Sequence, residues 1–417
     1  MEKSGKFRLT SLERNWILYD VGNSAFVLMV ATLIPIFFNA LAAAGGLSSV
    51  EYLAYWGYAS SAVTIITAVL SPILGTVADT KGFKKPIFIL CVFVGIVGCC
   101  AMGAVSAWLP FLVIFVIAKV GFSGSLVFYD SMLSDVTTPE RMDEVSSRGY
   151  AWGYIGSCVP FVVCLGLVLG AGSIGISQIT ALNLALLLTA AWWLLTTLPL
   201  LKSYKQLYYV EVEKHAVRQS FARIGHTLRH LPEDKQVFWF LLAFFCYIDG
   251  VYTIIDMATA YGTALGLDTT GLLLALLVTQ IVAFPSALIF GRLSNKYPSA
   301  KLIPVCIAAY AGIAVFAFFL TRQWQFWVLA VIVGMFQGGV QALSRSHFAK
   351  IIPPEKSGEY FGLFDICGKG ASFLGTMIVS VGSQLTGSAN VGVGSLIVLF
   401  IVGFVLFRVS CRQSETA

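Results

Sequence analysis

The sequence predicts an all-α polytopic membrane protein in which twelve transmembrane helices form two pseudo-symmetric six-helix bundles. Three observations predict this fold: the apolar composition, twelve long apolar runs, and a repeat between the two halves of the chain. Of the 417 residues, 58% are hydrophobic and 12% are charged, whereas a water-soluble domain carries about 25% charged residues. This number of charged residues is too small for a surface that faces water. We therefore expect the protein to lie in a lipid bilayer.

The apolar runs predict where each helix lies. A helix needs roughly 20 residues to cross the hydrocarbon core, because it rises about 1.5 Å per residue. Runs of that length lie near 15–43, 51–77, 86–106, 109–135, 148–170, 178–200, 236–264, 270–295, 301–321, 324–350, 359–385 and 391–410.

Basic residues predict the orientation, because loops rich in Lys and Arg stay in the cytoplasm. Of the 27 Lys and Arg, the loops opposite the chain ends hold only Arg322, and Lys119 and Lys369 lie inside predicted helices. We therefore expect both termini in the cytoplasm, and we attribute the net charge of +6 to this asymmetry and not to nucleic-acid binding. Residues 1–14 carry no pattern of a cleavable signal peptide. The expectation is a monomer in a bacterial inner (plasma) membrane, with anionic lipid headgroups as partners at its cytoplasmic face.

The repeat joins two segments at an offset of 215 residues. FYDSMLSDVTTPERMDEVSSRGYAWGYIGS (residues 128–157) aligns with LSRSHFAKIIPPEKSGEYFGLFDICGKGAS (residues 343–372). Each copy reads as an apolar helix end, a short polar turn and a new helix start. Tandem repeats of this kind are typical of transporters, so we predict an N-terminal bundle over 1–200 and a C-terminal bundle over 236–417.

Residues 201–235 are predicted to form a cytoplasmic linker. Apolar residues recur there at steps of four and three with basic residues mostly elsewhere around the helix, which predicts an amphipathic basic helix on the inner leaflet. The apolar positions are Val217, Phe221, Ile224, Leu228 and Leu231.

A second repeated motif lies in the loop after the second predicted helix. GTVADTKGFKK (residues 75–85) recurs in degenerate form as GRLSNKYPSAK (residues 291–301). The pattern resembles the signature loop of the major facilitator superfamily, which implies a conformational latch. Its members here are Gly75, Asp79, Gly82, Lys84 and Lys85, and the paired lysines also suit anionic headgroups.

Several stretches together resemble the vacuole-effluxer-like branch of the major facilitators. They are YDVGNSAF (residues 19–26), the segment at 128–157 and QALSRSHFAKIIPPEKSGEYFGLFDICGKGASFLG (residues 341–375). The resemblance covers essentially the whole chain and implies a twelve-helix solute carrier whose supported substrate class is amino acids. The family tends to have Asn where Asp130 stands and bulkier residues at Val21 and Gly22, so a site there is retuned in this chain.

The sequence contains no motif for catalysis or for a bound cofactor. It has no phosphate-cradling GxxxxGK[ST] loop and no nucleophile with a nearby His in a recognisable motif. Its nine Cys have no CxxC spacing, so we expect no metal, no cofactor and no enzyme activity. Transport is then expected to be driven by a gradient.

Three charges are predicted to lie about midway across the membrane, where major facilitators bind substrate. They are Lys119, Asp249 and Lys369. We expect Asp249 to bind the ammonium group of a zwitterion and Lys369 its carboxylate. An alternative is that Lys369 only neutralises Asp249 or Asp365, and the two lysines could instead favour an organic anion. The other substrate-binding candidates are Asp20, Asn23, Tyr252, Trp152, Gln341 and Asp365.

The repeated hairpins are predicted to form a gate. Superposing the two copies places Asp130 over Arg345 and Asp135 over Lys350, so pairs of opposite charge should meet when the bundles close on the cytoplasmic side. Asp20 and Asp130 are also candidates for proton coupling, because a low-dielectric setting raises the cost of the charged form. The remaining gate candidates are Glu140, Arg148, Glu355 and Glu359.

We therefore predict a transporter of amino acids or similar small zwitterionic metabolites that works by alternating access, with proton-coupled export as one form. The alternatives are a carrier of organic anions, peptides or lipid-like solutes and, in a different class, a receptor or scaffold that moves no solute.

Overall fold

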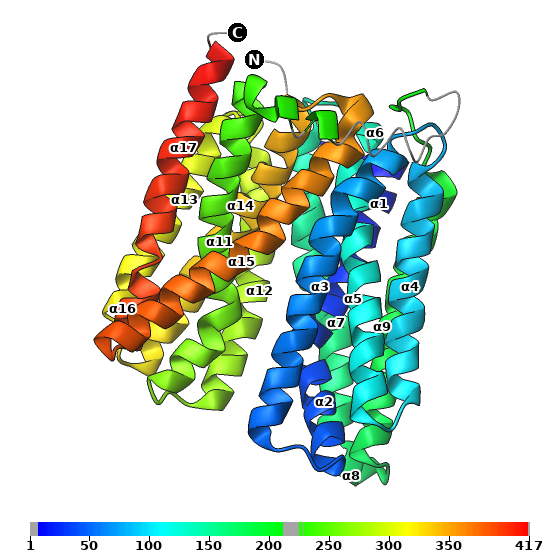
Figure 1. Cartoon of the computed structure of the whole chain (residues 1–417), viewed down its shortest axis with the longest axis vertical. Coiled ribbons are helices and arrows are strands. Elements are labelled where there is room, and N and C mark those ends of the chain that lie inside the picture. Colours follow the sequence, from blue (N-terminus) through cyan, green and yellow to red (C-terminus); the bar gives the residue numbers. More distant parts are fainter. Residues whose placement is uncertain (1–6, 212–224, 228, 416–417) are drawn as a thin grey trace.

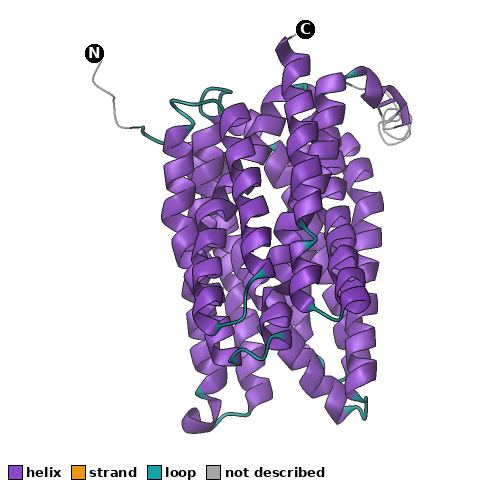
Figure 2. Cartoon of the chain, turned by 90° about the vertical axis from the view of Figure 1, so that its left-hand side faces the viewer, coloured by secondary structure: helices purple, strands orange, loops and turns teal. Residues whose placement is uncertain are grey.

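The computed structural model describes residues 7–211, 225–227 and 229–415, apart from a few side chains that include those of residues 369–373. Nearly all of this part of the chain is helical (Figure 1, Figure 2). Within it, one isolated β-bridge joins Thr80 to Val210.

The N-terminal bundle contains six spans. A break at Thr32 divides the first span into α1 and α2, and the short α6 and α8 follow α5 and α7. Its helices are α1 (Ser11–Ala31), α2 (Leu33–Ala44), α3 (Ser49–Ala78), α4 (Lys84–Ala104), α5 (Trp108–Ser131), α6 (Leu133–Val136), α7 (Met142–Leu169), α8 (Ala171–Ile174) and α9 (Gln178–Ser203).

The C-terminal bundle repeats this plan. The short α16 precedes α17 in its last span, and one-turn 3-10 helices precede α11 and α15. Its elements are η1 (Leu231–Glu233), α11 (Lys235–Ala264), α12 (Thr269–Leu293), α13 (Ser299–Phe318), α14 (Gln323–Ile351), η2 (Pro354–Lys356), α15 (Ser357–Thr386), α16 (Ala389–Gly394) and α17 (Ile397–Glu415).

The twelve predicted spans are confirmed. Among the described residues, 11 helical segments are long and apolar enough to cross a membrane, and the 30-residue α15 adds the twelfth. Local sequence signals set several boundaries, because a side-chain oxygen can satisfy the free N–H groups of a first helical turn. Thr10 with Glu13 and Ser48 with Glu51 form capping boxes at α1 and α3, and Asp268 caps α12.

The start of α1 and the end of α17 lie on the same side of the molecule, which we call the terminal side (Figure 1, Figure 2). The two bundles meet on the terminal side and diverge toward the opposite side (Figure 1). Across their boundary, α3 packs against α15, and α7 packs against α12 and α14.

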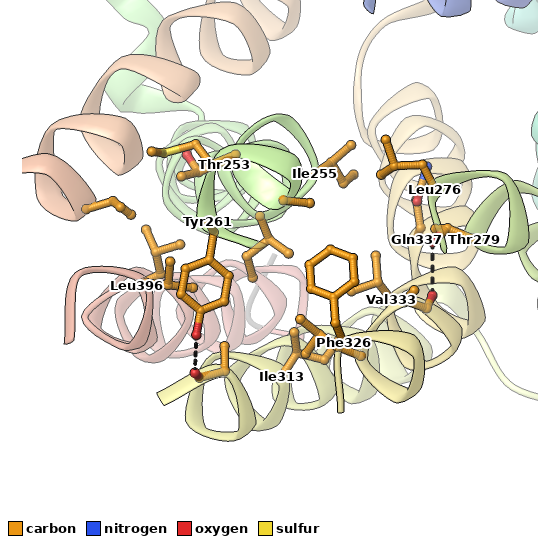
Figure 3. Close-up of a pocket in the computed structure, with 18 of the residues that line it drawn as sticks. Thr253, Ile255, Tyr261, Leu276, Thr279, Ile313, Phe326, Val333, Gln337 and Leu396 are labelled. Carbon is orange, nitrogen blue, oxygen red and sulfur yellow. Dashed lines mark hydrogen bonds between the residues drawn. The ribbon is translucent and has the colours of Figure 1, made fainter. Parts of the chain in front are cut away.

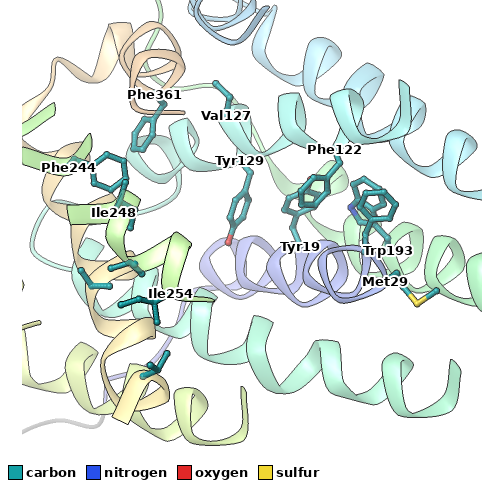
Figure 4. Close-up of a cluster of buried hydrophobic side chains, with 14 of the residues drawn as sticks. Tyr19, Met29, Phe122, Val127, Tyr129, Trp193, Phe244, Ile248, Ile254 and Phe361 are labelled. Carbon is teal, nitrogen blue, oxygen red and sulfur yellow. The ribbon is translucent and has the colours of Figure 1, made fainter. Parts of the chain in front are cut away.

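Aromatic and aliphatic side chains fill the interior of each bundle (Figure 4). In the N-terminal bundle, the ring of Trp193 lies 5.6 Å from Phe26 and 5.7 Å from Phe122, measured between ring centroids. In the C-terminal bundle, the rings of Phe244 and Phe364 stack at 3.9 Å. Helices in lipid associate through such close packing rather than through hydrophobic expulsion from water.

The first part of the linker is docked on the N-terminal bundle. Gln206 donates to the carbonyl of Ala78 at 3.1 Å and accepts from the N–H of Gly82 at 3.0 Å. The predicted amphipathic helix over residues 217–231 lies largely outside the described residues.

Candidate functional site

Arg345 crosses from one bundle into the other. It lies on α14 of the C-terminal bundle, and its Nη1 is 3.0 Å from Oδ1 of Asp130 on α5 and 3.7 Å from Oδ2 of Asp20 on α1. Its guanidinium also donates to the hydroxyl of Ser146 at 2.9 Å and to the Ser146 carbonyl at 3.0 Å. We call Arg345, Asp130, Asp20 and Ser146 the Arg345 cluster.

Three aromatic rings of the N-terminal bundle surround the same guanidinium. Its central carbon lies 4.7 Å from the ring centroid of Trp16, 5.4 Å from Tyr129 and 4.3 Å from Tyr150. The side chain of Arg345 is only 2% exposed. Aromatic faces attract a cation most strongly where water is excluded, so the rings and the carboxylates together replace the lost hydration.

The structure brings Asp130 and Arg345 together as the repeat predicts, but the predicted pairing of Asp135 with Lys350 is wrong. Asp135 lies on α6 and faces its own bundle, where it contacts Lys84 at 3.5 Å and accepts from the linker N–H groups of Leu207 and Tyr208 at 3.0 Å each. Lys350 instead pairs with Asp143 at 2.6 Å. The break of α5 at Met132 turns Asp135 toward the linker.

The loop of residues 75–85, the latch loop, caps a helix of the other bundle. Asp79 follows α3, and its two carboxylate oxygens accept from the N–H groups of Gly358 and Glu359 at 2.7 and 2.8 Å. These groups belong to the first turn of α15, where the helix dipole favours negative charge. Gly75 makes this approach possible, because a Cβ there would lie 2.1 Å from the Gly358 carbonyl oxygen.

Lys84 is buried within this latch, so our expectation that it faces lipid headgroups is wrong. Its side chain is 0% exposed, and its Nζ lies 3.7 Å from Asp79 and 3.5 Å from Asp135. It also donates to Ser357 of α15 at 2.9 Å. Lys85 contacts the carbonyl of Tyr204 at 3.4 Å.

The capping contact of Asp79 predicts a pH effect. Burial raises the pKa of Asp79 to about 7 despite Lys84 and the two N–H donors. Its pKa returns to about 4 where the carboxyl meets water, so the capped form binds the proton more tightly and is favoured at low pH. From pH 6 to pH 8 we expect the ratio of capped to open form to fall about tenfold, measured as hydrogen exchange of Gly358 and Glu359 corrected for intrinsic rates.

The Asp79→Asn protein is the control for this prediction, because it cannot titrate at that position. Its exchange ratio between pH 6 and pH 8 should be flat. An unmodified protein with equally flat exchange would show that Asp79 keeps one protonation state over this range.

The second copy of the latch loop makes the matching contact between bundles. Asn295 stands where Asp79 stands in the first copy, and its amide donates to Oε2 of Glu144 at 2.7 Å. A Cβ on Gly291, the counterpart of Gly75, would lie 2.8 Å from the Cβ of Ser147. The duplication therefore places a close glycine contact and a polar contact on both sides of the boundary.

The other gate candidates lie in different surroundings in this conformation. Arg148 pairs with Glu144 on its own helix. Glu140 and Glu355 are exposed. Glu359 is buried, and its N–H is one of the two donors to Asp79. Their expected part in the gate stays a prediction.

The structure places Asp249 inside the C-terminal bundle. Its carboxylate is 0% exposed, and Oδ1 accepts from the N–H of Gly375 at 2.9 Å and from the Thr253 hydroxyl at 3.3 Å. In this conformation a solute cannot reach it. Lys369 lies on α15, but its side chain is outside the described residues. The expected cradle of Asp249 and Lys369 stays a prediction.

Other substrate candidates lie at the boundary of the bundles. Asp365 accepts from Ser71 of α3 at 2.7 Å, and Gln341 contacts the Tyr154 hydroxyl at 3.5 Å. Trp152 packs edge-on against Phe284 of α12 and is 47% exposed.

The remaining substrate candidates lie on α1 and α11. Asn23 is buried on α1 and lies 3.5 Å from Asp20. Tyr252, on α11, is in electrostatic range of Asp130 and Arg345.

An apolar chamber lies within the C-terminal bundle, between α11, α12, α13 and α14 (Figure 3). Tyr261, Phe326 and Val333 are among its walls, and Gln337, Gln280 and Thr279 supply polar atoms. None of the described residues that line the chamber is charged, so a charged solute must find its counter-ions elsewhere.

Sequence reasoning predicted Asp130 as a partner of Arg345 but missed Ser146 and Trp16 beside Arg345 and Asp143 beside Lys350. Ser146 and Asp143 lie in the first repeat segment, yet their counterparts Phe361 and Gly358 carry no matching chemistry. Trp16 lies on α1, outside the repeat. The signal that the sequence offers for this surface is the group of polar residues directly before the predicted span at 148–170, Asp143, Glu144, Ser146 and Ser147, all of which are buried in the structure.

Two six-helix bundles joined across a buried charge cluster define a membrane transporter of the major facilitator type. A family model described as vacuole effluxer Atg22-like matches residues 11–416, and the chain belongs to this family.

Two relatives, one of high and one of low sequence identity, support this assignment. The MFS-type transporter YxiO of Bacillus subtilis (strain 168), described as uncharacterized, is 42% identical over 414 residues, which cover 98% of this chain and 97% of YxiO. Autophagy-related protein 22 of Coccidioides immitis (strain RS) is 25% identical over 315 residues, which cover 65% of this chain but only 51% of the fungal protein.

A solved structure shows the same fold. The human organic anion transporter MFSD10 (TETRAN) superposes with a TM-score of 0.72 at 14% sequence identity, covering 95% of this chain and 98% of that one.

Proposed function

We propose that this protein moves amino acids or similar small zwitterionic metabolites across a bacterial plasma membrane by alternating access, as a proton-coupled exporter. The Arg345 cluster is the observation that carries the proposal. It joins the bundles on the terminal side, while the bundles diverge on the opposite side (Figure 1). A structure in which the bundles are joined on one side and separated on the other corresponds to one state of an alternating-access cycle.

A buried ion cluster suits a joint that must open and reclose. Taking its charges out of water costs several kcal/mol per ion, at order of magnitude, and their mutual attraction repays much of this cost. In the closed form, the desolvation cost and the attraction between the charges are therefore of similar size. A small change in either one can shift the equilibrium between the closed and open forms. The placement of Lys and Arg favours a cytoplasmic terminal side, so the conformation described is closed toward the cytoplasm.

The composition of the cluster supports proton coupling. Two carboxylates, Asp20 and Asp130, face one guanidinium within 4 Å, so the group carries one excess negative charge when both are ionised. Oδ2 of Asp20 is buried without a hydrogen-bond partner in the described structure. One proton on either carboxylate makes the closed cluster neutral, which lowers the cost of burying it. Closing the terminal side then takes up a proton, and opening it releases one.

Counterflow in vesicles tests the transport proposal. Purified protein in liposomes preloaded with one unlabelled amino acid should accumulate the labelled form above the level of protein-free vesicles for several neutral amino acids. An imposed pH gradient should increase the accumulation, and Asp20→Asn should abolish that increase while exchange continues.

Three outcomes would contradict parts of this proposal. Exchange of organic acids alone would identify an anion carrier. Binding of amino acids, seen as a raised melting temperature, without exchange would identify a receptor. Equal response of the unmodified and Asp20→Asn proteins to the pH gradient would exclude Asp20 as the coupling group.

A further inference from the structure

Asp256 is a second acidic residue of α11 and differs from Asp249 in its surroundings. Asp249 is buried against α15, whereas Asp256 is exposed. Asp256 lies eight residues before the end of α11 at Ala264, which places it about 12 Å inside the opposite end of that helix. An exposed carboxylate at membrane depth usually faces a water-filled cavity or a partner charge.

Lys119 supplies the partner charge from the other bundle. It lies on α5, and its ammonium is within electrostatic range of Asp256. Its Nζ lies 4.7 Å from the ring centroid of Phe122 and 6.0 Å from that of Phe26, and the side chain is partly exposed. Lys119 follows the start of α5 at Trp108 by 11 residues, about 17 Å along the helix, so the two charges enter from the same side to similar depths.

The two charges lie between the Arg345 cluster and the open side, and Lys119 precedes Asp130 of the cluster by 11 residues on α5, about 17 Å along the helix. Tyr252 precedes Asp256 by one helical turn, so both side chains lie on the same face of α11. Tyr252 is in electrostatic range of Arg345 and Asp130 as well as of Asp256. The face of α11 that bears Tyr252 and Asp256 therefore points to the centre between the bundles, while Thr253 and Met257 point into the apolar chamber.

We propose that Lys119 and Asp256 bind the two charged ends of a zwitterionic substrate, with its carboxylate at Lys119 and its ammonium at Asp256. This assignment rests on the proposed function and deepens it by naming the residues that select the substrate. Each charge belongs to a different bundle, so a bound zwitterion links the bundles on their open side. The linkage draws that side closed, which is the step that must follow binding in an alternating-access cycle.

The assignment predicts which chemical groups the protein requires. Leucine serves as the probe, because its side chain carries no charge of its own. N-acetylleucine keeps the carboxylate and loses the ammonium charge, whereas leucine amide keeps the ammonium and loses the carboxylate. Unmodified protein in liposomes should exchange leucine with at least tenfold higher apparent affinity than either derivative.

Two charge-neutralising variants should then lose affinity in a crossed pattern. Asp256→Asn should weaken leucine exchange about 10- to 100-fold, the range expected for one charge-assisted contact, and leave competition by N-acetylleucine unchanged. Lys119→Gln should weaken leucine by a similar factor and leave competition by leucine amide unchanged. Glu233→Gln and Lys301→Gln, at exposed positions, are the matched controls and should behave as the unmodified protein.

A double variant with the two charges exchanged distinguishes loss of the binding charges from loss of folding. Lys119→Asp combined with Asp256→Lys should recover leucine exchange that each single reversal removes, because the zwitterion can bind in the reverse direction. Unmodified selectivity in both neutral variants would overturn the assignment and leave the proposed function standing. Failure of the unmodified protein to exchange leucine or any other amino acid would overturn the proposed function, and this assignment with it.

Discussion

Replacing Arg345 by Gln is expected to abolish most of the transport activity. The substitution leaves Asp20 and Asp130 buried without their cation, and removing one partner of a buried ion pair costs about 3–5 kcal/mol. That cost falls on the form in which the terminal side is closed, so the ratio of closed to open form should drop roughly 100- to 5,000-fold. The initial rate of amino-acid counterflow measures the consequence, because a carrier held in one form cannot complete the cycle.

A variant in which the whole cluster is neutral distinguishes the effect of breaking the charge pairs from the effect of removing the arginine side chain. The triple variant Asp20→Asn, Asp130→Asn and Arg345→Gln removes every charge of the cluster at once, and such replacements are far less harmful than breaking a pair. It should recover much of the closed form, although not the response to a pH gradient. Arg408→Gln, at an exposed position of α17, is the matched control. Normal counterflow in the Arg345→Gln protein would contradict the role of the cluster.

Gly75→Ala is expected to keep the terminal side from closing. The new Cβ would lie 2.1 Å from the carbonyl oxygen of Gly358 and 2.7 Å from its carbonyl carbon. Both are backbone atoms, so no change of rotamer relieves the clash, and α3 and α15 must move apart by more than 1 Å, at about the cost of overpacking a core. That movement breaks the two hydrogen bonds from Gly358 and Glu359 to Asp79.

Hydrogen exchange and counterflow both report this effect. Overpacking typically costs about 1–3 kcal/mol, so protection of the first turn of α15 should fall about 10- to 100-fold, and exchange of amino acids should fall with it. Gly57→Ala is the control on the same helix, because a Cβ at Gly57 meets no atom within 4 Å. Equal protection in the two variants would show that the contact of α3 with α15 is not needed for closure.

The sequence was enough to predict the helices and one contact between the bundles. The apolar runs place all twelve spans within about six residues of their observed ends, because the bilayer imposes a minimum length on each helix. The repeat also predicts the meeting of Asp130 and Arg345, because duplicated helices related by a pseudo-twofold axis bring equivalent positions together.

The rest of the site depends on which way a side chain points, and the sequence does not encode this directly. α11 is apolar around most of its circumference, so its periodicity does not separate the buried Asp249 from the exposed Asp256. Counting depth from the first residue of the helix favours Asp249, but α11 has 30 residues, and Asp256, which is within electrostatic range of Lys119, lies two turns further on.

Neighbouring residues of the same type also lie in different surroundings. Lys84 and Lys85 have the same chemistry, yet only Lys84 is completely buried beneath α15. The break after Ser131 turned Asp135 from the expected gate to the linker. Both outcomes result from tertiary contacts between segments more than 70 residues apart.

The most direct test of the account measures two distances between spin labels in the same protein. One pair, at Lys202 and Tyr297, spans the bundles on the terminal side, and the other, at Ile174 and Leu385, spans them on the opposite side; all four positions are exposed. On going from the parent protein to its Arg345→Gln variant, the terminal-side distance should lengthen while the opposite-side distance shortens. Distances that stay unchanged, or that lengthen together, would contradict two bundles that rock about a joint closed by Arg345.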